Sequence, residues 1–185
     1  MPVWRLLGGA QSRVPAYITF GLPEYTVDQL IEVANMFVAQ GEDKLKMVVG
    51  VAGDHQAPLE DARRVRAVRD AVGDGIQLSI DANYMFQFNN ALKLAKNIED
   101  CDIEWFEEPI WGNDALLLHD LRMKQSIPIS AGQNEGHRFR HRELLVHRVG
   151  DHVLAVVGHH RLGRAEPLHA PHHIADCLGA HKLVP

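Results

Sequence analysis

The chain has 185 residues, of which 46% are hydrophobic, and its formal net charge at pH 7 is −5. This length suffices for one domain with a good core, and the acidic balance without a dominant basic patch disfavours nucleic acid and membranes as partners. No apolar run approaches the ~20 residues of a membrane span, and no signal-peptide pattern opens the sequence. We therefore expect a soluble, cytoplasmic protein. The two cysteines fit a reducing compartment better than a disulfide framework.

The first predicted strand and helix follow a leading segment, residues 1–13, in which apolar residues such as Leu6 require burial. Residues 14–21 predict the first strand. Thr26, with Gln29 three residues further on, forms a capping-box pattern at the start of an amphipathic helix.

Lysines mark the second predicted strand, residues 44–50. Strand alternation places Lys44, Lys46 and Val48 on one face. If this face points into a barrel, the Lys46 ammonium lies near the mouth and can face a substrate, and Lys44 is the other candidate catalytic lysine. The alternative is that the head of Lys46 simply extends into solvent at the strand end.

The next predicted helix, residues 58–72, carries a run of arginines. Its apolar residues recur at helical spacing and face the core. The rest of the helix holds Arg63, Arg64, Arg66 and Arg69. We interpret them as a solvated outer face, although such a run could also form an anion site.

Three apolar runs then lead to an oxygen-bearing side chain at a constant interval. Asp81 closes IQLSID, Glu107 closes IEWFE and Gln133 follows IPISAG, so both gaps are 26 residues (107 − 81 and 133 − 107). A strand, a helix and two short loops occupy a similar length, which predicts successive β/α units of a parallel barrel. Neighbouring barrel strands end at one mouth, where two carboxylates and an amide oxygen suit Mg²⁺. The sequence therefore predicts a metal site.

The same residues carry a family resemblance. The strings DAN, WFEEP and IPISAGQNE, in this order and spacing, resemble the barrel of the enolase superfamily, in its mandelate racemase and muconate lactonizing enzyme branch. The resemblance implies Asp81 and Glu107 as Mg²⁺ ligands, and the family normally has a glutamate where Gln133 stands. Because an amide leaves the site one negative charge short, Glu135 is the candidate that could complete the metal site in place of Gln133.

The resemblance also implies a fold and a chemistry. The fold is an α/β protein of the TIM type, an incomplete (β/α) barrel of about six units in one domain, without the capping domain and the last strands. The chemistry is Mg²⁺-dependent abstraction of a proton α to a carboxylate, and we expect an acid-sugar dehydratase, with racemases and cycloisomerases as relatives. The lysine pair of the family places its first lysine at Lys46 and its second, commonly the base, at Val48, so the identity of the base stays open.

Four residues are candidates for binding a small carboxylate substrate such as an acid sugar. Asn83 and Glu108 stand just beyond the predicted metal ligands. His137 and Arg138 open a basic amphipathic helix over residues 137–148, and a solvated helix face is the alternative interpretation for both. The apolar side chains expected to face inward are Phe139, Leu144 and Leu145.

The pattern changes beyond residue 148. Residues 153–157 could form a sixth strand, but residues 149–172 have no clear period, and we hypothesise a reading-frame disturbance in the gene, which resequencing would test. Alternatively, the histidines of this segment bind a transition metal. They are His159, His160, His169, His172 and His173.

A second class of function stays open beside the enzyme. Missing strands would leave an exposed sheet edge, which tends to pair with another chain. The chain would then be a catalytically inactive barrel fragment that acts as an assembly partner or homo-oligomer. An unrelated barrel enzyme with a phosphate site is a third hypothesis, which no glycine-rich loop before a helix supports.

Overall fold

The computed structural model describes residues 3–6, 8–9, 15–50, 57–149 and 152–153, and within them parallel strands alternate with helices. The strands form one sheet in chain order. They are β1 (Ile18–Phe20), β2 (Lys44–Val48), β3 (Gln77–Asp81), β4 (Ile103–Glu107), β5 (Ile129–Ala131) and β6 (His152–Val153). The helices are α1 (Val3–Leu6), α2 (Val27–Ala39), α3 (Ala57–Val72), α4 (Phe88–Asn97), the 3₁₀ helix η1 (Trp111–Asn113), α5 (Ala115–Lys124) and α6 (Arg138–Val146).

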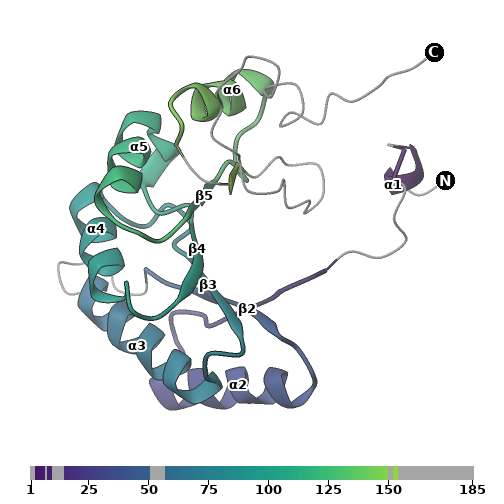
Figure 1. Cartoon of the computed structure of the whole chain (residues 1–185), viewed down its shortest axis with the longest axis vertical. Helices are drawn as coiled ribbons and strands as arrows, with labels where there is room; N and C mark the ends of the chain where they lie inside the picture. Colours follow the sequence, from purple (N-terminus) through teal and green to yellow (C-terminus); the bar gives the residue numbers. More distant parts are fainter. Residues whose placement is uncertain (1–2, 7, 10–14, 51–56, 150–151, 154–185) are drawn as a thin grey trace.

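The sheet curves into an arc, with α2 to α6 along its outer side (Figure 1). This arrangement confirms the predicted succession of β/α units and the parallel sheet. Within the described ranges β1 and β6 do not pair, so these residues form an arc and not a closed barrel. No helix of these ranges is both long and apolar enough to cross a bilayer.

Local signals define the helix ends. At α2, the Thr26 hydroxyl accepts from the Gln29 N–H at 3.2 Å, and the Gln29 side chain accepts from the Thr26 N–H at 2.9 Å. The predicted capping box is therefore confirmed. At α5, the Asp114 carboxylate accepts from the N–H groups of Leu116 and Leu117, which satisfies donors that the first turn leaves free.

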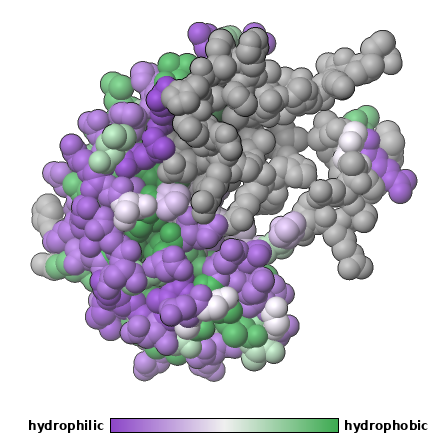
Figure 2. Space-filling model, viewed as in Figure 1, coloured by the Kyte–Doolittle hydropathy of each residue, from purple (hydrophilic) through white to green (hydrophobic). Residues whose placement is uncertain are grey.

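The core lies between the sheet and the helices, and hydrophilic residues predominate among the described residues on the face seen in Figure 2. Each fully buried aliphatic side chain contributes about 1.5–3 kcal/mol of burial free energy. The fully buried aliphatic side chains include Leu30, Leu45, Met47, Val65, Val68, Leu78, Ile80, Leu94, Leu118 and Leu121.

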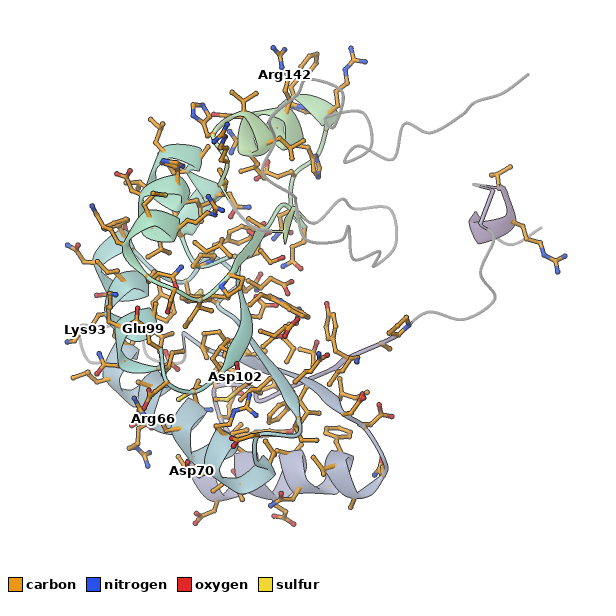
Figure 3. The ribbon with its side chains drawn as sticks, viewed as in Figure 1. Arg66, Asp70, Lys93, Glu99, Asp102 and Arg142 are labelled. Carbon is orange, nitrogen blue, oxygen red and sulfur yellow. The ribbon has the colours of Figure 1, made fainter. Side chains whose placement is uncertain are left out.

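The arginine face of α3 differs from the prediction. Arg66 does lie outside, paired with Asp100 at 2.6 Å, and Figure 3 shows it on the outer side of the helical layer. Arg64 and Arg69, however, are buried, with 4% and 6% of their surface exposed. The Arg69 guanidinium donates to four main-chain carbonyls at 2.8–2.9 Å, those of Gly73, Ile76, Cys101 and Asp102.

Two apolar residues expected to be buried are exposed. Leu6 on the one-turn helix α1 is 69% exposed, and Phe139 on α6 is 59% exposed. Phe139 lies on the outer side of its helix, with its ring 5.6 Å from the His137 ring. Of the three inward positions predicted on this helix, only Leu144 is fully buried.

Candidate metal centre at the strand ends

Asp81 and Glu107 are the last residues of β3 and β4 and lie opposite each other in the ladder. Strand alternation explains their direction, because the apolar neighbours Ile80 and Phe106 belong to the core on the helix side. On the other side of β3, Val48 of β2 lies in register with Asp81. The structure therefore brings the two predicted carboxylate ligands to one edge of the sheet.

The Lys46 ammonium lies between the two carboxylates. Its Nζ is 2.8 Å from Glu107 Oε2 and 3.0 Å from Asp81 Oδ2, and it donates to the Tyr17 hydroxyl oxygen at 3.3 Å. All three donors of the ammonium thus have partners. Only 5% of the Lys46 side chain is exposed, which contradicts the alternative of a lysine head extending into solvent.

The charges at this edge depend on one another. Burial lowers the pKa of Lys46, but the Asp81 and Glu107 carboxylates outweigh it, so this pKa lies above its ordinary value. Burial and the adjacent Asp81 raise the pKa of Glu107, against the opposing effect of Lys46. Two carboxylates at a buried edge favour a cation between them, and the ammonium supplies one positive charge.

Two aromatic residues that the sequence analysis did not single out form a wall of the site. The Trp105 indole N–H donates to Glu107 Oε2 at 3.1 Å, and the Tyr17 ring meets the Trp105 ring edge to face with centroids 5.6 Å apart. Lys46 Nζ lies 4.8 Å from the centre of the Tyr17 ring. The spacing of Trp105 two residues before Glu107 was the available signal, because it places both on one strand face.

The third predicted ligand position, Gln133, follows β5 and lies beside the loop after β3. Its Nε2 is 3.5 Å from Asn83 Oδ1, and the Asn83 N–H donates to Asp81 Oδ1 at 2.9 Å. Asn83 therefore connects the β3 carboxylate with the side chain that follows β5. The structure brings these three predicted residues together.

Glu108 and Glu135 have other partners. Glu108 is fully buried, and its Oε1 accepts from the N–H groups of Gly132 and Gln133, so it does not face a substrate. Glu135 accepts from Asn113 at 3.1 Å and from Arg140 at 3.0 Å. Both carboxylate oxygens of Glu135 are thus engaged away from the Asp81 and Glu107 pair.

Other predicted residues lie elsewhere. Lys44 stands at the start of β2, 3.8 Å from Asp43. His137 and Arg138 are exposed and both lie near the Phe139 ring, with the Arg138 guanidinium 5.0 Å from its ring centre. The five clustered histidines and most of the hypothesised frame disturbance, residues 149–172, lie outside the described residues.

The donor set suits a hard divalent cation. Asp81 and Glu107 converge on one cationic centre, and the Gln133 amide offers a neutral oxygen of the kind Mg²⁺ accepts. Across the described ranges, no group of three or more His, Cys, Asp and Glu residues could hold a metal, and the predicted donor set accordingly combines two carboxylates with an amide.

A model of the family described as enolase C-terminal domain-like matches residues 29–176. The chain belongs to the enolase superfamily. The mandelate racemase and muconate lactonizing enzyme branch supplies several of its solved relatives, and one of these, an enzyme of this name with 32% identity, covers 83% of this chain with a TM-score of 0.72. The family resemblance carried by the three sequence strings is thus confirmed.

Relatives of this enolase-superfamily chain include enzymes named for acid sugars. Arabinonate dehydratase of Saccharolobus solfataricus is 29% identical over 154 residues, which are 82% of this chain and 40% of that enzyme. L-talarate dehydratase from Polaromonas sp. JS666, solved in complex with Mg and L-glucarate, is 29% identical with a TM-score of 0.72, covering 81% of this chain and 41% of that one. The chain thus spans less than half the length of these relatives.

Proposed function

We propose that this chain supplies the metal-binding part of a Mg²⁺-dependent enzyme of the cytoplasm that removes a proton α to a carboxylate, as an acid-sugar dehydratase. The observation that carries the proposal is that the carboxylates of Asp81 and Glu107, at the ends of neighbouring strands, both contact the ammonium of Lys46. Two carboxylates therefore meet at one cation. The names of the relatives, arabinonate dehydratase and L-talarate/galactarate dehydratase, support an acid sugar as the substrate class.

Asp81, Glu107 and the Gln133 amide oxygen would hold the ion. When bound, Mg²⁺ would stabilise the negative charge that develops on the substrate carboxylate as the α proton leaves. Lys46 offers a fixed positive charge to the same carboxylate, since its ammonium is buried at this edge and oriented by Tyr17. The Trp105 indole holds Glu107 in place through its hydrogen bond.

A second candidate function is binding without turnover. Val48 lies in register with Asp81, where the family resemblance implies the lysine base, and a valine side chain accepts no proton. This observation favours a chain that binds the metal and carboxylate ligands but performs no proton abstraction alone.

The test is the thermal unfolding of the full chain with and without millimolar Mg²⁺. We expect Mg²⁺ to raise the melting temperature of the wild type, because a ligand at 100 times its Kd stabilises the folded state by about 2.7 kcal/mol. Asp81→Asn should abolish the rise. The matched control, Asp43→Asn, removes a carboxylate at the opposite end of the β2 strand and should leave it intact.

A melting temperature indifferent to Mg²⁺ in the wild type would contradict the proposal. A wild type that responds to Mg²⁺ should next be incubated with a panel of acid sugars that includes arabinonate, galactarate and talarate. Formation of a dehydrated product supports the dehydratase, and saturable sugar binding without product supports the second candidate.

A further inference from the structure

Glu108 is a buried acid that the metal centre does not explain. It follows the proposed ligand Glu107 directly, none of its surface is exposed, and its φ of 45° lies in the left-handed region that non-glycine residues rarely adopt. This turn of the main chain directs the Glu108 side chain toward the end of β5 and not toward the carboxylate pair. A strained, fully buried acid at the edge of a site calls for a specific partner.

The partner is the main chain after β5. Glu108 Oε1 accepts from the N–H of Gly132 at 2.7 Å and from the N–H of Gln133 at 2.8 Å. Two successive N–H groups that point to one oxygen form a small concave binding site for a carboxyl group. Gly132 has a φ of 117°, which permits this turn and would strain any other residue.

The Glu108 main chain connects the same strand ends. Its N–H donates to the Ser130 carbonyl at 2.8 Å, and its carbonyl accepts from the Tyr84 N–H at 2.9 Å. One residue therefore links the loop after β3, the end of β4 and the turn after β5. These are the three elements that carry Asp81, Glu107 and Gln133.

From this geometry we infer that Glu108 is a positioning residue for residue 133. Its side chain fixes the main chain of Gly132 and Gln133, and thereby holds the Gln133 side chain beside Asn83 at the metal-binding edge. Glu108 itself contacts neither ion nor substrate, which replaces its predicted role in substrate binding. The ligand role of residue 133 rests on the proposed function, whereas the fixation of its main chain does not.

The fixation is tested without metal, by amide hydrogen exchange at Gly132 and Gln133 in the NMR spectrum. We expect Glu108→Ala to accelerate exchange of both amides at least tenfold, and Glu108→Gln, which keeps an acceptor oxygen, to preserve protection. Leu118→Ala is the control for general destabilisation, because it opens a cavity in α5 away from these amides. Protection that survives in Glu108→Ala would overturn the inference.

The consequence for the metal is tested by a double-mutant cycle on Mg²⁺ affinity. Gln133→Glu restores a third carboxylate, and we expect it to tighten binding on the order of tenfold in the wild-type and Glu108→Gln backgrounds. In the Glu108→Ala background the gain should disappear. An equal gain in Glu108→Ala would refute positioning of the side chain by Glu108.

The two arms separate this inference from the proposed function. If Gln133→Glu tightens Mg²⁺ binding in no background while amide protection still depends on Glu108, the ligand role of residue 133 is wrong and the fixation by Glu108 is supported. If neither measurement depends on Glu108, the inference is wrong, whatever the wild type does with Mg²⁺.

Discussion

Val48 of β2 lies directly beside Asp81 of β3 in the parallel ladder, so an apolar side chain stands level with a proposed metal ligand. The resemblance to the enolase superfamily implies a lysine base at this position. The two proposed metal ligands, Asp81 and Glu107, are thus present while a valine occupies the position for which the resemblance implies the base.

We predict that Val48→Lys introduces proton abstraction. With Mg²⁺ and an acid sugar in D₂O, the variant should exchange the α proton of the sugar, measured by NMR, at a rate above that of the wild type. Val48→Met is the control, since it adds comparable length without an amine. Equal exchange in the lysine and methionine variants would show that an amine at position 48 does not remove the α proton.

The buried ammonium is predicted to stabilise the metal-free protein. Lys46→Met leaves two buried carboxylates uncompensated, which costs about 3–5 kcal/mol in the free energy of unfolding, measured by urea denaturation. Mg²⁺ should restore part of the loss, because it supplies the missing positive charge. Lys44→Met should change stability little, since Lys44 lies 3.8 Å from an exposed carboxylate. A Lys46→Met protein as stable as the wild type would contradict this account of the charges.

We predict that the titration of Glu108 makes the free energy of unfolding of the metal-free protein depend on pH. Burial raises the pKa of Glu108 from 4.5 to about 7, so the folded state keeps a proton that the unfolded chain loses. The contribution of Glu108 to the free energy of unfolding is then fully present below about pH 4.5 and is lost as pH rises through about 7, by about 3 kcal/mol in total. Glu108→Gln should lack this part of the decline between pH 5 and 8. Parallel stability curves for both proteins would rule it out.

Arg69 is predicted to be a structural arginine. Its guanidinium satisfies four main-chain carbonyls, so Arg69→Met should lower the free energy of unfolding by about 2–4 kcal/mol. Arg66→Met is the matched control on the same helix, because Arg66 is on the outer surface and its loss should have a small effect. Similar losses in the two variants would mean that the carbonyl contacts of Arg69 add nothing to the free energy of unfolding beyond what a surface ion pair contributes.

Much of the fold follows from periodic patterns. The constant 26-residue interval located Asp81 and Glu107 at strand ends. The capping box at Thr26 and Gln29 is likewise a local signal between residues three apart. Such features depend on neighbours in sequence, which is why the sequence alone predicts them.

Contacts between distant segments could not be predicted in this way. Both Arg66 and Arg69 contact residues more than 30 positions away, but Arg66 pairs at the surface with Asp100. Arg69 is buried and donates to the carbonyls of Cys101 and Asp102, just before β4. Glu135 suited a metal by its chemistry, but Asn113 and Arg140 occupy its oxygens. The placement of the Glu108 carboxyl depends on N–H groups of Gly132 and Gln133, in the turn that follows the next strand.

The strands of the metal centre are neighbours in sequence as well as in space. The three side chains proposed to hold the ion, those of Asp81, Glu107 and Gln133, come from consecutive β/α units of the chain. A ribosome that makes this chain therefore delivers all three proposed donors before it reaches α6. The same contiguity makes residues 44–135 a natural unit for transplantation into another barrel.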